Sequence, residues 1–227
     1  KEPEKPVPAP VERTGRPYTF KERKLTASEL EYWQQYGITP EILEQYKVCS
    51  VVQFQSENAD GNPFSYSSTK EEPIYGYKNK RFIKLYRPFS KTRFLYGGNI
   101  GESYCFGLEQ LPSKGDTLFI TGGEKDVMSL AAHGFHAICF NSETVTVPPN
   151  IIYKLTFRFK HIILLYDMDA TGVESAKKHE KQLCEYGVKR LLLPLQGTKE
   201  EKDISDYFRA GNSRENFIKL FIDFLDT

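Results

Sequence analysis

The strongest constraint on the fold is an alternation of apolar strands with helical segments in the second half of the chain. Six elements are predicted in the order strand, helix, strand, strand, helix, strand, at residues 117–121, 124–133, 136–140, 161–166, 172–186 and 189–193. Strands that are apolar along their whole length and alternate with helices are typical of a parallel sheet covered on both faces. We therefore predict an α/β fold for this part of the chain.

The first half of the chain has a different pattern. Residues 1–24 are rich in proline and charged residues, so we expect a disordered linker there. Two short helices are expected next, one capped by Thr26 or Ser28 and one by Thr39. Aromatic and β-branched residues then alternate between turn residues, which predicts short antiparallel strands at 48–54, 73–77 and 81–87.

These patterns divide the chain into four predicted segments. They are a linker at 1–24, a smaller α+β subdomain at 25–115, a parallel-sheet domain at 116–212 and a C-terminal helix at 213–227.

The formal net charge of +1 excludes a general attraction to nucleic acid, so any such binding must come from local patches. No apolar run approaches the roughly 20 residues of a membrane span, and the four cysteines are widely spaced. We expect a cytoplasmic protein without a membrane partner.

Acidic residues follow three of the four predicted strands. Glu124 and Asp126 follow the first, Asp167 and Asp169 the third, and Asp203 the fourth. Open parallel sheets bind ligands at the carboxyl ends of their strands, so these side chains should converge at one edge. Asp167 and Asp169 are two residues apart and should point to the same side, where they repel each other unless a cation lies between them. Hard carboxylate oxygens suit magnesium.

Two alternatives compete with a metal site. Asp167 and Asp169 could instead belong to a solvated turn and a helix cap, with no metal bound. Asp126, in a first helical turn, would in any case interact favourably with the helix dipole. The D-x-D-x-T loop of phosphatases that form an aspartyl-phosphate also matches residues 167–171. That loop follows the first strand in those folds, whereas here it follows the third. Three acidic clusters after three strands favour the metal hypothesis.

A basic segment without any acidic residue lies in the first half of the chain. It contains Lys78, Lys80, Arg81, Lys84, Arg87, Lys91 and Arg93. Aromatic residues such as Phe89 and Phe94 are interleaved with them. Basic side chains neutralise phosphates and aromatic rings stack on bases, so we predict contact with nucleic acid or nucleotide phosphates. An edge strand protected from aggregation by lysine and arginine is the alternative.

The order of strand, GGEKD, helix, strand, DMDATG, helix and KDISD resembles the Toprim fold of bacterial and phage primases, topoisomerases and some nucleases. The segments YGITPE at 36–41 and FLYGG at 94–98, on either side of the basic strands, are similar to the subdomain that precedes Toprim in phage-type primase–helicases. The resemblance covers about residues 28–212. It implies a DNA primase core, a magnesium-dependent nucleotidyltransferase that makes RNA primers on single-stranded DNA from ribonucleoside triphosphates. Replication of a mobile element or phage-like replicon is the expected setting.

The resemblance also implies roles for particular residues. Asp167, Asp169 and Asp203 would hold magnesium, with manganese as an expected substitute, and Asp126 would be a further catalytic carboxylate. The predicted ligands of the template or the triphosphate are Lys84, Arg87, Lys91, Arg93, Lys125 and Lys202.

One position departs from the family pattern. The first Toprim motif usually opens with a glutamate that acts as general base, and this chain has Gly122 there. We predict that Glu124 supplies the missing carboxylate as a catalytic residue and metal ligand. The alternative is a catalytically impaired module that binds metal and DNA within a replicative helicase. Zinc-binding and helicase domains are expected as partners outside these 227 residues, because the chain has neither a cysteine cluster nor a G-x-x-x-x-G-K-[ST] motif.

Overall fold

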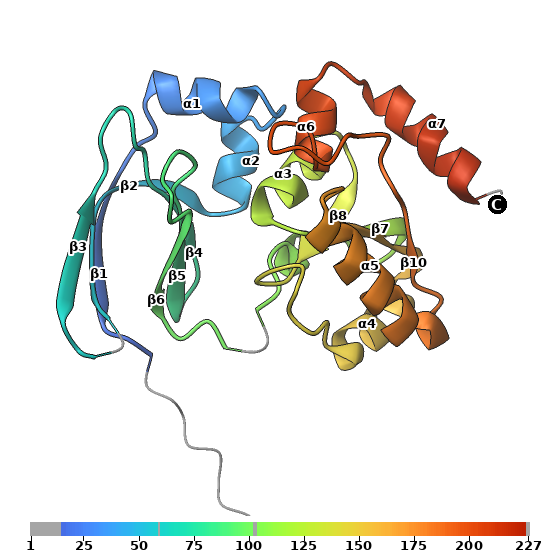
Figure 1. Ribbon diagram of the computed structural model, residues 1–227, viewed down its shortest axis with the longest axis horizontal. Helices are drawn as coiled ribbons and strands as arrows, with labels where there is room; N and C mark the ends of the chain where they lie inside the picture. The colour runs from blue at the N-terminus through green and yellow to red at the C-terminus, as the bar shows by residue number, and fades with distance from the viewer. Residues whose placement is uncertain (1–14, 59, 102–103, 226–227) are drawn as a thin grey trace, which may run out of the picture. The chain divides into compact units, whose positions relative to one another are not determined.

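The computed structural model describes residues 15–58, 60–101 and 104–225 (Figure 1). The chain divides into two compact units. Among the described residues, the first unit contains those up to Arg23 together with those of Ser50–Gly101, and the second contains Lys24–Cys49 and those after Gly101. The two short helices between residues 24 and 49 therefore group with the second unit rather than with the strands that follow them.

The first unit is built on a curled antiparallel sheet. Its strands are β1 (Tyr18–Arg23), β2 (Val48–Glu57), β3 (Pro63–Ser67), β4 (Tyr75–Lys78), β5 (Phe82–Tyr86) and β6 (Phe94–Gly98). They are ordered β1-β2-β4-β5-β6, and β3 also pairs with β2. A single bridge between Arg16 and Gly98 links the two ends of this order, so the sheet closes on itself. Phe54, Ile83 and Leu85 are buried in its core.

The prediction of disorder up to residue 24 was wrong for Tyr18–Arg23, which forms β1. This strand pairs with β2, more than 25 residues further along the chain, with Phe20 opposite Phe54. The strand that supplies its hydrogen bonds is therefore distant in the sequence. Because four of its six residues are exposed, the composition of β1 resembles that of a linker, and the strand could not be predicted from it. Residues 1–14 lie outside the described residues. The predicted strands at 48–54, 73–77 and 81–87 correspond to β2, β4 and β5, whereas β3 and β6 were not predicted.

The second unit contains the predicted parallel sheet, which confirms the α/β fold class. Its elements are α1 (Ala27–Gln34), α2 (Pro40–Gln45), η1 (Leu108–Gln110), β7 (Gly115–Thr121), α3 (Glu124–Ala132), β8 (His136–Cys139), α4 (Pro149–Thr156), β9 (Phe159–Leu165), α5 (Ala170–Gln182), η2 (Cys184–Tyr186), β10 (Lys189–Arg190), α6 (Ile204–Arg209) and α7 (Arg214–Leu225). The strand order is β10-β9-β7-β8, and every neighbouring pair is parallel.

Both faces of this sheet are covered, as strands that are apolar throughout require. Alternate residues of β7 show the two faces. Leu118 and Ile120 belong to a core cluster that includes Ile152 of α4 and Ala176 of α5. Phe119 points the other way and packs against the aromatic rings of α7. The helices α4 and α5 therefore cover one face, and α7 packs against the other face through Phe119.

Helix caps explain where the first helices of this unit begin. Thr26 caps α1 and forms a capping box with Glu29, in which each side chain accepts from the other residue's backbone N–H. Thr39 precedes α2, and Pro40 is at its first position, where a missing N–H leaves no hydrogen bond unmade. The predicted cap by Thr26 is confirmed, whereas Thr39 lies at the N-cap position without a side-chain capping hydrogen bond.

The structure departs from the predicted elements at three places in this unit. The fourth strand, β10, has only two residues. The helices α4 and α6 were not predicted, because α4 begins at paired prolines and α6 lies in a segment that is highly charged at its start. Among the described residues, no helix is both long enough and apolar enough to cross a membrane.

Candidate metal centre at the carboxyl edge of the parallel sheet

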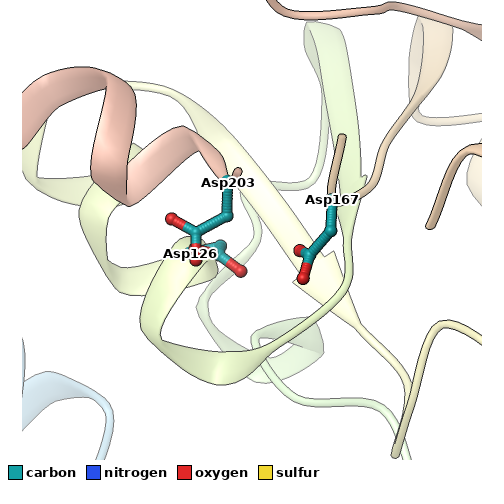
Figure 2. Close-up of side chains that lie close together, drawn as sticks. All are labelled: Asp126, Asp167 and Asp203. Atoms are coloured by element: carbon teal, nitrogen blue, oxygen red, sulfur yellow. The ribbon is translucent and has the colours of Figure 1, made fainter. Parts of the chain in front are cut away.

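Three carboxylates from distant parts of the chain meet at the carboxyl edge of the sheet. Asp126 lies in the first turn of α3, Asp167 lies two residues after β9, and Asp203 is the N-cap of α6. One oxygen from each lies within 4.8 Å of the others. Figure 2 shows the three side chains directed toward a common space. Asp126 and Asp203 are buried and Asp167 is partly buried.

Local hydrogen bonds fix the two loops that carry Asp167 and Asp203. The backbone N–H of Met168 donates to the carbonyl of Lys202 at 2.7 Å, which joins the loops directly. Asp203 accepts from the backbone N–H of Asp206 at 2.8 Å and so caps α6. A Cβ on Gly172 would collide with the backbone carbonyl of Asp167, so the turn into α5 requires glycine at that position.

Asp126 is held by the neighbouring helix. The hydroxyl of Ser205, on α6, donates to Asp126 Oδ1 at 2.6 Å. The bond connects α3 with α6 and orients the carboxylate of Asp126 toward the cluster. Ser205 is fully buried, and nothing in the sequence pattern singled it out.

Burial and mutual repulsion dominate the electrostatics of the cluster. Burial raises the pKa of Asp126 well above its ordinary value, and the charge of Asp203 raises it further. The pKa of Asp167 is raised by the same two causes in the same order. Carboxylates arranged in this way favour either a bound proton or a bound cation.

Two lysines provide partial neutralisation. Lys202 Nζ contacts carboxylate oxygens of both Asp167 and Asp169, the second at 2.8 Å. Burial opposes the charge of Lys202, but hydrogen bonds and the charges of both aspartates outweigh burial and raise its pKa. Lys125 Nζ lies 3.1 Å from Asp203 Oδ2 and 4.3 Å from the centre of the Tyr36 ring. Both lysines were predicted as ligands of the template or the triphosphate, and the structure places them beside the carboxylates.

The donor set fits a hard divalent cation. All three groups are carboxylates, which Mg²⁺ and Mn²⁺ prefer, and opposite ligands of an octahedral Mg²⁺ are about 4.2 Å apart. The separation of up to 4.8 Å is therefore close to that of ligands around one ion. The ammonium between Asp167 and Asp169 shows that this edge already accommodates positive charge. Asp126, Asp167 and Asp203 are thus the residues that could hold a metal.

Two residues predicted as metal ligands are engaged elsewhere. Asp169 caps α5 by accepting from the backbone N–H of Gly172 at 3.0 Å, and it reaches the cluster only through Lys202. Burial acts to raise the pKa of Asp169, but the hydrogen bonds from Lys202 and Gly172 lower it overall. Glu124 is buried, and its Oε1 accepts from the hydroxyl of Tyr104 at 2.6 Å. Among the described residues, neither joins the three-carboxylate group.

A further carboxylate, Glu143, lies beside the cluster and was not predicted. It follows β8 in the loop that leads toward α4. Burial raises its pKa to about 7, with further contributions from the charges of Asp167 and Asp169. The signal in the sequence was an acidic residue after the second strand of the sheet, at a position equivalent to the other acidic clusters.

The predicted basic segment lies in the first unit and is only partly exposed. Lys84 is buried on β5, with its ammonium 4.7 Å from the centre of the Phe94 ring. Arg87 lies 3.6 Å from Glu72 and is mostly buried. Lys91 and Arg93 are exposed in the loop between β5 and β6. Aromatic rings nearby in the chain are also accessible, including Phe89, which is 61% exposed.

Residues 119–208, which contain the parallel sheet and its acidic edge, match the family model described as Toprim-like. Over 82–87% of its length the chain is similar in fold to solved DNA primase fragments and catalytic cores. It is similar to the primase fragment of the bacteriophage T7 primase-helicase protein, with a TM-score of 0.57 and 17% identity, over 82% of this chain and 71% of that one.

Bacterial primases show the same likeness. The DnaG primase catalytic domain bound to single-stranded DNA matches with a TM-score of 0.63 and 16% identity, over 87% of this chain and 74% of that one. The primase catalytic core of E. coli matches with a TM-score of 0.59 and 16% identity, over 84% of this chain and 71% of that one. A search of curated proteins found no match. The predicted resemblance to Toprim primases is therefore confirmed for the fold.

Proposed function

We propose that this chain is the core of a DNA primase that synthesises RNA primers on single-stranded DNA and uses Mg²⁺. The observation that carries the proposal is the convergence of Asp126, Asp167 and Asp203 within 4.8 Å at the carboxyl edge of a Toprim-like sheet. A bound divalent ion would stabilise negative charge on the oxygens of the reacting phosphate. The similar T7 protein is a primase-helicase, and the similar DnaG domain binds single-stranded DNA.

At this edge, different residues of the second unit would bind the cation and the triphosphate. The three aspartates would hold the cation and fix its position, because each is anchored by a helix or by a hydrogen-bonded loop. Lys202 and Lys125 would exchange their present carboxylate partners for oxygens of the triphosphate. An ammonium group suits this exchange because it is a compact charge on a flexible stem.

The exposed residues of the first unit would bind the template. Lys91 and Arg93 would neutralise phosphates of single-stranded DNA, and the accessible ring of Phe89 would stack on a base. Lys84 and Arg87 would act mainly by supporting this surface, since Lys84 is buried and Arg87 already contacts Glu72. Zinc-binding and helicase domains are proposed as partners in the full protein, in the replication of a mobile element or phage-like replicon.

A second candidate function follows from Gly122, which replaces the usual glutamate of the first motif. A Toprim domain without this carboxylate could bind metal and DNA inside a replicative helicase without making primers. Glycine at this position removes a side chain that would otherwise start 3.2 Å from Asp167 Oδ1. The two functions predict different outcomes in a single assay.

The test is primer synthesis on single-stranded DNA with labelled ribonucleoside triphosphates and Mg²⁺ or Mn²⁺. We expect short ribonucleotide products that disappear in Asp167→Asn and persist in the matched surface variant Asp223→Asn, since Asp223 is exposed on α7. Metal-dependent DNA binding without products would support the second function. If neither products nor metal-dependent DNA binding are found, both functions are excluded.

A further inference from the structure

Glu143 fills the space that a side chain at position 122 would need. A Cβ on Gly122 would lie 3.0 Å from Glu143 Oε2 and 3.2 Å from Asp167 Oδ1. Both oxygens therefore face the point where that side chain would begin. Contacts this short are tighter than most real Cβ contacts, so a side chain at position 122 would make Glu143 shift by a few tenths of an ångström. The side chain that is absent at Gly122 and the carboxylate of Glu143 would therefore compete for the same space.

The carboxylate of Glu143 accepts a backbone hydrogen bond but also has a buried oxygen without a hydrogen-bond partner. The backbone N–H of Asp167 donates to it, which ties the loop after β8 to the loop after β9. Glu143 Oε2 is buried and has no hydrogen-bond partner. Buried carboxylate oxygens are normally paired, so an unpaired one beside Asp167 favours either a bound proton or a bound cation.

Charge balance also favours a role for Glu143. A primase site that lacks the glutamate at position 122 loses one negative charge beside Asp167. Glu143 would restore a carboxylate beside Asp167 from the loop that follows a different strand of the same sheet, β8. Glu124, the carboxylate nearest to Gly122 in the chain, is instead bonded to Tyr104.

We propose that Glu143, which lies outside the 4.8 Å group formed by Asp126, Asp167 and Asp203, replaces the carboxylate missing at Gly122 and joins their cation site as a fourth carboxylate. The inference rests on the proposed metal site and adds to it a residue from the loop after β8. It assigns to Glu143 the role that the sequence had predicted for Glu124. The cation class is a hard divalent ion such as Mg²⁺ or Mn²⁺, since all four donors are carboxylates.

Manganese binding to the full chain tests the proposal without any activity measurement. Titration followed by electron paramagnetic resonance should give an affinity that falls about 10- to 100-fold in Glu143→Gln, the range typical when a supporting group of a metal site is lost. Glutamine keeps the shape of the side chain and an acceptor for the N–H of Asp167, so the fold should persist. Glu185→Gln, at an exposed position in η2, should bind as the wild type does.

A carboxylate exchange gives the more demanding test. Gly122→Glu alone should weaken folding, because its Cβ would meet Glu143 Oε2 and a second negative charge would enter the same space. Glu143→Ala alone should bind manganese as weakly as Glu143→Gln. The double variant Gly122→Glu/Glu143→Ala should regain manganese affinity to within about threefold of the wild type, because the carboxylate has returned to its usual position.

The outcomes separate this inference from the proposed function. Wild-type manganese affinity in Glu143→Gln, together with loss of binding in Asp167→Asn, would refute the role of Glu143 and leave the three-aspartate site standing. Unchanged binding in both variants would refute the metal site itself. A double variant that folds, as judged by circular dichroism, but does not regain affinity would refute the equivalence of positions 122 and 143.

Discussion

Replacing Asp126 by asparagine should stabilise the metal-free protein while it abolishes stabilisation by metal. The three carboxylates lie within 4.8 Å of one another, and two charges about 5 Å apart repel by roughly 3 kcal/mol at an effective dielectric constant near 20. Lys125 and Lys202 offset part of this repulsion. Asparagine removes the charge but keeps an oxygen that can accept from Ser205. The expected net gain is about 1–2 kcal/mol.

The assay is thermal unfolding of the wild type and Asp126→Asn in a chelator and in excess Mg²⁺ or Mn²⁺. A gain of 1 kcal/mol raises Tm by about 2–4 °C in a domain of this size, so Asp126→Asn should melt about 2–8 °C above the wild type in chelator. Metal at 100 times its Kd should stabilise the wild type by about 2.7 kcal/mol and the variant far less. Adding metal should therefore reduce the difference between the two Tm values or reverse their order.

The difference in chelator should also depend on pH. The pKa values of Asp126 and Asp167 are raised by burial and by Asp203, so these groups stabilise the folded state when protonated, and that stability is lost as pH rises through the raised pKa values. The advantage of Asp126→Asn should thus shrink toward acid pH. Asp223→Asn serves as the control with no expected effect. A lower Tm for Asp126→Asn in chelator, or a metal-induced shift equal to that of the wild type, would refute the reasoning.

Three further predictions concern other parts of the chain. Alanine at Lys91 and at Arg93 should weaken single-stranded DNA binding and lower the slope of log affinity against log salt by up to about one for each charge, measured by fluorescence anisotropy; an unchanged slope would contradict phosphate contact. Phe217→Ala should destabilise the second unit by about 3–5 kcal/mol in chemical denaturation, since Phe217 is fully buried; a loss below about 1 kcal/mol would contradict its core position. A thiol reagent at pH 8 should modify exposed Cys184 quickly and spare Cys105, whose pKa burial raises to about 12; equal rates would contradict this difference.

Much of the fold was predictable because its signals are local. The apolar strands β7, β8 and β9 each form a continuous run, and a parallel sheet needs such runs because both of its faces are buried. The rule that ligands bind at the carboxyl ends of such strands then indicated the edge where the acidic side chains meet. Asp126, Asp167 and Asp203 meet there, although 41 and 36 residues separate the successive positions.

The remaining features depend on partners that are distant in the sequence. The strand β1 exists because β2 supplies its hydrogen bonds, and α6 is stabilised by the cap from Asp203 and by the bond from Ser205 to α3. The contact of Glu143 with position 122 appears only when β8 is placed beside β7. Nearness in the chain therefore pointed to Glu124, whereas nearness in space points to Glu143.

The position of Lys202 has a consequence for how the protein would acquire its ion. Its ammonium group links Asp167 and Asp169, and its backbone carbonyl accepts from Met168, so the loops on both sides of the site are joined before any metal arrives. Binding of the proposed metal ion would then require only that the Lys202 side chain move, not that a domain fold. The chain should survive purification in chelator, and the free magnesium of its surroundings would set how many molecules are loaded at any moment.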